Sequence, residues 1–91
     1  MIILVTPRFS RTVKKILPKE KESLDQAASV IIKSSKIGEI KKGDLSGTRV
    51  FKYRFLQQQM LLAYSVSLDQ TRIVLMSYGT HENFYRDLKK Y

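Results

Sequence analysis

The only two prolines of the chain, Pro7 and Pro18, divide its first third and limit how that part can fold. Pro7 suits the first position of a helix, because its missing N–H would have no helical partner there, and Thr6 before it is a good N-cap. Pro18 is expected to end this helix. Between the prolines, apolar residues recur at helical spacing, and basic residues occupy the other side. The apolar residues are Phe9, Val13, Ile16 and Leu17, and the basic residues are Arg8, Arg11, Lys14 and Lys15.

A second amphipathic pattern covers residues 19–34 and follows the first almost without a connection. Its apolar stripe consists of Leu24, Ala27, Ala28, Ile31 and Ile32. Two helices joined this closely form an antiparallel hairpin. Each helix still has an apolar stripe to bury, so we expect a sheet to cover the hairpin.

Four segments have the length and composition of β-strands. The strands are expected at residues 1–5, 49–55, 60–68 and 72–78. The connections between helix and strand, and between strands, are expected at residues 36–47, 56–59 and 69–71. The first segment is a compact apolar run, which predicts a buried strand.

The order β-α-α-β-β-β-α, with a short C-terminal helix as its last element, predicts an α+β fold. A helical hairpin would pack on one face of a mainly antiparallel four-stranded sheet. A chain of 91 residues is long enough for one small domain and too short for two, so we expect a single domain over residues 1–91.

The predicted strand at residues 49–55 alternates aromatic and basic side chains. Phe51, Tyr53 and Phe55 share one of its faces, and Lys52 and Arg54 share the other. The aromatic face suits packing against the helices. We therefore expect Lys52 and Arg54 to lie on the opposite, open face of the sheet.

The end of the chain carries its only histidine at a point where a strand is expected to stop and a helix to begin. Gly79 would break the strand, and Thr80 would cap a helix that starts with His81. His81 and Tyr85 then lie four residues apart on one helical face. Imidazole transfers protons readily near neutral pH, so this pair suits chemistry on a phosphodiester.

Charge and composition narrow the classes of partner. Seventeen Lys and Arg against eight Asp and Glu give a net charge of +9, which favours a polyanionic partner: nucleic acid, an anionic membrane surface or an acidic protein. No cysteine and one histidine leave no obvious metal site, and we expect no metal and no cofactor. The apolar start is too short for a signal peptide or a membrane span. We therefore expect a soluble, cytoplasmic protein without membrane contact.

These pieces, in this order, resemble the RelE/ParE superfamily of toxins from bacterial type II toxin–antitoxin modules. The resemblance extends over nearly the whole chain. It is carried by the opening strand and helical hairpin, the loop at residues 43–47, the strand at 51–55, Leu61-Leu62-Ala63-Tyr64 and Tyr78-Gly79-Thr80-His81. The resemblance implies a cognate antitoxin as partner. It also implies one of two toxic activities, since some members cut mRNA in the ribosomal A site and others inhibit DNA gyrase.

The ending Gly79-Thr80-His81, followed by the aromatic Tyr85, resembles the YafQ-type ribonucleases. This resemblance implies a ribosome-dependent mRNA endoribonuclease in which His81 is catalytic and Tyr85 supports it. Lys52 and Arg54 match basic residues of RelE-like members and are expected to hold the scissile phosphate as part of the catalytic set. Other basic residues are predicted to contact phosphates of mRNA or ribosomal RNA. These candidates are Lys41, Lys42, Arg49, Arg86, Lys89 and Lys90.

Three positions depart from these relatives and leave other functions open. Leu61 stands where many RelE-like members have arginine. Phe55 and Gln59 stand near the places where YafQ-like members have histidine and aspartate. A catalytic site with fewer polar residues than in these relatives is compatible with a ParE-like gyrase inhibitor that has no nuclease activity. A small nucleic-acid-binding domain of this fold without a toxin role is the third alternative.

Overall fold

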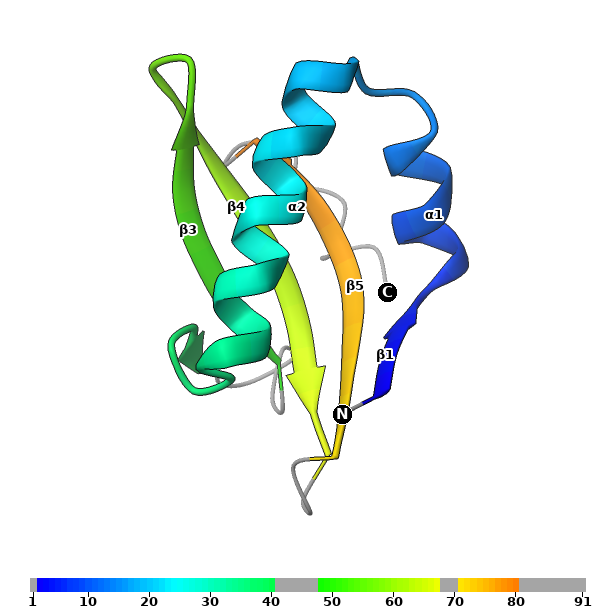
Figure 1. Cartoon of the computed structure of the whole chain (residues 1–91), viewed down its shortest axis with the longest axis vertical. Helices are drawn as coiled ribbons and strands as arrows, with labels where there is room; N and C mark the ends of the chain where they lie inside the picture. Colours follow the sequence, from blue (N-terminus) through cyan, green and yellow to red (C-terminus); the bar gives the residue numbers. More distant parts are fainter. Residues whose placement is uncertain (1, 41–47, 68–70, 81–91) are drawn as a thin grey trace.

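The computed structural model describes residues 2–40, 48–67 and 71–80 of the chain. Its elements in chain order are β1 (Ile2–Val5), α1 (Pro7–Val13), α2 (Pro18–Lys33), β2 (Glu39–Ile40), β3 (Arg49–Phe55), β4 (Gln58–Val66) and β5 (Arg72–Thr80). The sheet has the strand order β1-β5-β4-β3-β2, and both helices cover the same face of it (Figure 1). Strands β1 and β5 are parallel, and the other neighbours are antiparallel. The predicted α+β architecture, with a helical hairpin on a mainly antiparallel sheet, is confirmed.

The start of α1 follows the sequence prediction, but its end does not. Thr6 Oγ1 accepts a hydrogen bond from the Phe9 amide at 3.1 Å, and Pro7 is the first helical residue. The helix ends at Val13, earlier than predicted. Pro18 begins α2 instead of ending α1, since a proline needs no amide partner in the first turn of a helix either.

The main core lies between the helices and the sheet. It is formed by Phe9, Leu24, Ala27, Ile31, Met60, Leu62, Tyr64, Ile73, Leu75 and Tyr78. A β-bulge in β5 keeps its core residues on the side of the sheet that faces the helices. Ala63 pairs with Ser77 but Tyr64 pairs with Leu75, so Met76 has no opposite residue in β4. The extra residue allows Leu75 and Tyr78 to face the helices together, while Met76 packs on the other side of the sheet.

The first strand is not buried as predicted. Its four side chains are all exposed, with Leu4 at 46% and Val5 at 51% of their full accessible surface. The reason is its position, because β1 is an edge strand that pairs only with β5 among the strands described. An apolar run predicts a strand, but it does not distinguish the centre of a sheet from its edge.

Two connections also differ from the prediction. The segment expected to be a loop at residues 36–47 contains the two-residue strand β2, which pairs with Arg49 and Val50 and gives the sheet a fifth strand. The turn between β3 and β4 is shorter than residues 56–59. It consists of Leu56 and Gln57, both with positive φ, which is the backbone of a tight two-residue hairpin.

The last strand is longer than predicted. Gly79 does not break β5, since it pairs with Leu61, and Thr80 pairs with Met60 as the last strand residue. The strand continues because β4 still offers a partner for both positions. The predicted C-terminal helix lies outside the described residues.

Candidate nucleic-acid interface

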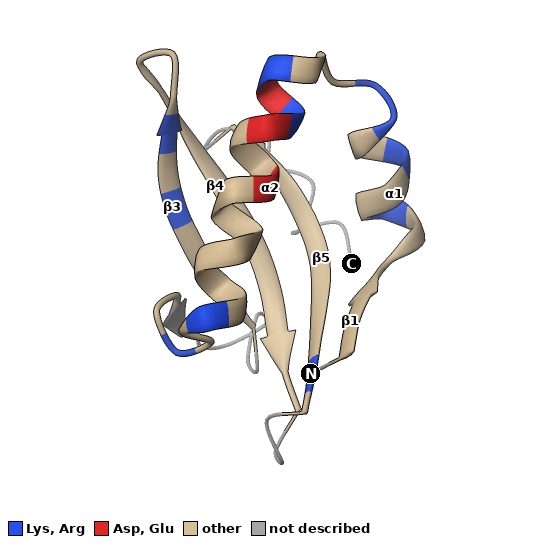
Figure 2. Ribbon diagram, viewed as in Figure 1, with Lys and Arg blue, Asp and Glu red and all other residues tan. Residues whose placement is uncertain are grey.

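Strand β3 presents a basic pair, Lys52 and Arg54, on the face of the sheet that the helices do not cover. Both residues are exposed, whereas Phe51, Tyr53 and Phe55 between and beside them are partly buried against the main core. The alternation predicted from sequence is therefore confirmed. Figure 2 shows the two cationic positions on β3, at the edge of the molecule away from α1.

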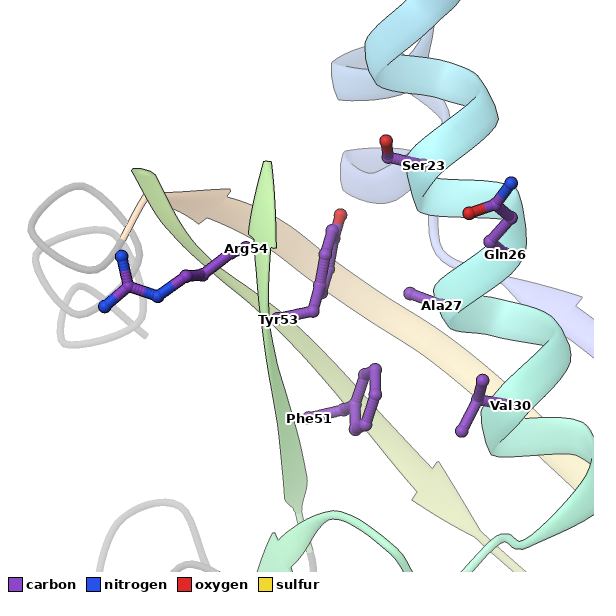
Figure 3. Close-up of a pocket in the computed structure, with 7 residues that line it drawn as sticks. All are labelled: Ser23, Gln26, Ala27, Val30, Phe51, Tyr53 and Arg54. Atoms are coloured by element: carbon purple, nitrogen blue, oxygen red, sulfur yellow. The ribbon is translucent and has the colours of Figure 1, made fainter. Parts of the chain in front are cut away.

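The aromatic side chains fix the direction of the basic pair. Phe51 and Tyr53 stack on each other with ring centroids 6.0 Å apart and an interplanar angle of 21°. Both point toward α2, where they line a shallow groove with Ala27 and Val30, and Arg54 points the other way (Figure 3). Because alternate side chains of a strand take opposite faces, this packing holds Lys52 and Arg54 outward.

The strand register gives the neighbours of the basic pair. Arg54 lies opposite Gln59, and Lys52 lies opposite Leu61, which in turn lies opposite Gly79. On this face the two cations are therefore bordered by the exposed amide of Gln59, by the fully buried Leu61 and by Gly79, which has no side chain. Directly opposite residues share a face, so the row from Lys52 to Gly79 crosses three strands at one level.

The end of β5 comes to the same end of the sheet as the basic pair. Thr80 pairs with Met60, which pairs with Tyr53, the residue between Lys52 and Arg54. Neighbouring strands lie about 4.8 Å apart, so the backbones of Tyr53 and Thr80 are roughly 10 Å apart. The predicted catalytic pair His81 and Tyr85 follows Thr80 in sequence and lies outside the described residues.

Arg49 has a structural role that its sequence position does not indicate. Its Nη1 donates hydrogen bonds to the carbonyl oxygens of Gly38 at 2.8 Å and Lys36 at 3.2 Å. The side chain therefore fastens the segment after α2 to the start of β3. A phosphate contact by Arg49 stays a prediction, and it would have to use the remaining donors of the guanidinium. The other predicted phosphate contacts lie outside the described residues, namely Lys41, Lys42, Arg86, Lys89 and Lys90.

A pair of buried hydroxyl groups lies between α2 and the same end of the sheet. The Oη atoms of Tyr53 and Tyr78 are buried near each other and near Glu20, but neither makes a hydrogen bond of good geometry within the described part of the chain. Burial raises the pKa of Tyr53 to about 12, and burial together with the nearby Tyr53 and Glu20 raises the pKa of Tyr78. Sequence reasoning missed these hydroxyls, because a tyrosine in an apolar strand has the same pattern as a phenylalanine.

The described residues offer no metal centre and no membrane span. No group of three or more His, Cys, Asp or Glu is placed to hold a metal ion in residues 2–40, 48–67 and 71–80. No helix of these segments is long and apolar enough to cross a membrane. Among the described residues, the exposed cations Lys52 and Arg54 and the amide of Gln59 suit binding of phosphate groups.

Comparison with protein families gives one match that covers most of the chain. Residues 3–89 match the sequence model of the ParE-like toxin of type II bacterial toxin–antitoxin systems. Among curated protein sequences, none matches this chain.

The fold is similar to solved structures of RelE toxins. Isolated E. coli RelE has a TM-score of 0.68 and 16% sequence identity, with 98% of this chain and 96% of that chain covered. A doubly substituted E. coli RelE in the free state has a TM-score of 0.74 and 17% identity, with 98% and 90% covered. A chain of the RelBE2 toxin–antitoxin complex from Mycobacterium tuberculosis has a TM-score of 0.69 and 17% identity, with 88% and 96% covered. At such identities the likeness shows a shared fold.

Proposed function

The chain belongs to the ParE-like toxins of type II bacterial toxin–antitoxin systems, and we propose that it acts as a ribosome-dependent mRNA endoribonuclease that blocks translation. The observation that carries this proposal is the exposed pair Lys52 and Arg54 at the end of the sheet to which β5 leads the chain. The ribosome is the site of action, so we also propose that the toxin acts in the cytoplasm.

The arrangement supports a mechanism without a metal ion. In RNA cleavage the 2′-hydroxyl gives its proton to solvent water and attacks the adjacent phosphorus, and the bond to the 5′-oxygen breaks. Lys52 and Arg54 would stabilise the negative charge that builds up on the phosphoryl oxygens, with Arg54 offering the better fork for two of them. His81 would donate a proton to the leaving 5′-oxygen, and Tyr85 would orient the nucleotide. The products are a 2′,3′-cyclic phosphate and a 5′-hydroxyl.

Inhibition of DNA gyrase without nuclease activity is the second candidate function. The matching family model describes ParE-like toxins. Leu61, fully buried at the level of Lys52, gives no polar group to a cleavage site. Gly79 in the same row has no side chain at all. These features weaken the catalytic set, and they would not matter to a toxin that acts only by binding a protein.

A cognate antitoxin is the proposed protein partner in either case. Structures of RelE toxins have been solved in complex with the antitoxin RelB, including a complex with a peptide of the antitoxin from E. coli. In this chain the exposed apolar strand β1 supports docking of such a partner, since Ile2 and Val5 each expose about half of their surface. Edge strands commonly accept an added strand from a binding partner.

Brief induction of the protein in a bacterium, followed by mapping of 5′ ends on abundant mRNAs, tests the activity. We expect new cuts at fixed positions within codons. The variant His81→Ala should lose roughly 10²–10⁴-fold of this cleavage, because a positioned general acid contributes about that factor. Asn83→Ala serves as a control in the same segment and should cut normally.

Two other results would decide against the ribonuclease. Growth arrest with intact mRNA and damaged or relaxed DNA would support gyrase as the target. Growth without arrest and without new cuts would contradict both toxic activities.

A further inference from the structure

A second basic surface lies on α1, on the opposite side of the molecule from Lys52 and Arg54 (Figure 2). It consists of Arg11, Lys14 and Lys15, which we call the α1 basic triad. All three side chains are exposed. Their spacing of three and four residues places them on one face of the helix and its C-terminal extension.

The packing of α1 explains why the triad faces solvent. Phe9 is buried in the main core, and Val13 and Ile16 pack against it. Arg11, Lys14 and Lys15 fall on the other side of the same turns. The structure therefore brings three like charges together, although their mutual repulsion weakens the helix. The negative end of the helix dipole favours a cation here, but it does not need three.

The α1 basic triad and the basic pair on β3 cannot contact one straight stretch of nucleic acid. Helix α1 packs on β5, on the helical face of the sheet, and β3 is two strands away with its cations on the other face. The acidic residues Glu20, Glu22 and Asp25 lie on the first half of α2, between α1 and β3 (Figure 2). Two phosphate-bearing segments are needed to engage both surfaces.

We propose that the α1 basic triad binds the sugar–phosphate backbone of folded ribosomal RNA, while Lys52 and Arg54 hold the mRNA. This inference rests on the proposed ribosome-dependent function. Long cationic side chains without exposed aromatic residues suit phosphate contacts that carry no sequence information. Arg11 and Lys15 are about 6 Å apart along the helix, so the triad can reach more than one phosphate. Such contacts would hold the toxin in a fixed orientation and leave the exposed Lys52 and Arg54 available to the substrate.

The test compares two triple variants with the same loss of charge. Arg11→Gln/Lys14→Gln/Lys15→Gln removes the α1 basic triad. Lys21→Gln/Lys33→Gln/Lys36→Gln removes three exposed lysines elsewhere and serves as the control. Binding of each purified protein to purified 70S ribosomes is measured between 50 and 200 mM KCl, and thermal unfolding verifies that both variants fold.

Loss of three phosphate contacts should reduce the slope of log K against log salt by about 2–3 for the first variant. Over this fourfold range of salt, binding of the wild type should therefore weaken about 16–64-fold more than binding of the triad variant. The control variant should keep the slope of the wild type.

Several results would overturn the inference. Equal slopes in the two variants would mean that only net charge matters, and an unchanged slope in the triad variant would mean that the triad contacts no phosphate. Normal ribosome binding with weaker binding of an acidic antitoxin peptide would assign the surface to the antitoxin. A wild type that binds ribosomes but leaves mRNA intact would contradict the ribonuclease proposal alone. A wild type that cuts mRNA, with a triad variant of unchanged slope, would contradict this inference alone.

Discussion

The backbone amide of Gly38 donates a hydrogen bond to Tyr64 Oη at 2.8 Å, and the two residues are so close that a Cβ on Gly38 would lie 2.6 Å from that oxygen. The same hydroxyl donates to the carbonyl oxygen of Ser35 at 2.7 Å. Tyr64 is fully buried in β4, so its hydroxyl ties the segment after α2 to the centre of the sheet. Arg49 completes this attachment through the carbonyl oxygens of Lys36 and Gly38.

Gly38→Ala should destabilise the protein by about 1–3 kcal/mol, which is the usual cost of adding a methyl group to a tightly packed site. The added carbon would meet the oxygen and ring carbons of Tyr64, all closer than 3.0 Å. Urea unfolding followed by circular dichroism measures the change. An alanine variant as stable as the wild type would show that the segment at Gly38 moves away from Tyr64 without cost.

Tyr64→Phe and Tyr78→Phe remove the same atom from two buried tyrosines and should have different effects. The first leaves the Gly38 amide and the Ser35 carbonyl without their partner, which costs about 1–3 kcal/mol. The second removes a hydroxyl that makes no hydrogen bond of good geometry among the described residues, so stability should change by less than about 0.5 kcal/mol or increase. Equal losses of unfolding free energy in the two variants would contradict the assignment of these hydroxyls.

Stability should fall at alkaline pH because of Tyr53 and Tyr78. Their pKa values are raised in the folded protein, that of Tyr53 from 10.0 to about 12. Below pH 10 both residues are protonated in the folded and the unfolded chain. As pH rises from 10 toward 12, only the unfolded chain loses these protons, so the unfolded state gains stability. In Tyr53→Phe/Tyr78→Phe, urea midpoints at pH 8, 10 and 11 should decline less steeply than in the wild type. Parallel declines would exclude these residues as the cause.

The succession of elements could be predicted from sequence because each element has its own hydrophobic period. Phe9 and Val13 recur at helical spacing and Phe51 and Tyr53 at strand spacing, and both pairs contact the core as expected. The exposure of Leu4 could not be predicted, because it depends on which strand lies beside β1. The continuation of β5 through Gly79 could not be predicted either, because it depends on the length of β4.

The candidate site could be predicted from sequence only where the pattern of a single strand or helix determines where a side chain points. Lys52 and Arg54 follow from the alternation of a single strand, and the structure places them as expected. The binding of Arg49 to the carbonyls of Lys36 and Gly38 depends on how the chain returns from α2 to β3. No local pattern contains that information. An exposed arginine in a strand predicts a phosphate contact, whereas Arg49 binds backbone carbonyl groups.

Gln57→Gly should stabilise the protein by about 1 kcal/mol. Leu56 and Gln57 form the turn between β3 and β4 with φ values of 53° and 60°, a conformation that costs a residue with a side chain roughly 1–2 kcal/mol and that glycine adopts freely. Gln58→Gly is the matched control, since Gln58 belongs to β4 and glycine weakens a strand. The two variants should shift the thermal midpoint in opposite directions. A shift in the same direction would contradict the assigned turn.

Arg54→Gln should lower mRNA cleavage roughly 10²-fold, a common result of removing one group that stabilises transition-state charge. Arg54→Lys keeps the charge but loses the planar fork, so its activity should fall between those of the wild type and the glutamine variant. Arg72→Gln is the control, because Arg72 is also exposed but starts β5 beside Ile2, at the other end of the sheet. Cleavage is measured on a defined mRNA with purified ribosomes, and circular dichroism verifies the fold of each variant. Equal losses in Arg54→Gln and Arg72→Gln would mean that general attraction to RNA, and not a phosphate held at the end of β3, accounts for the role of Arg54.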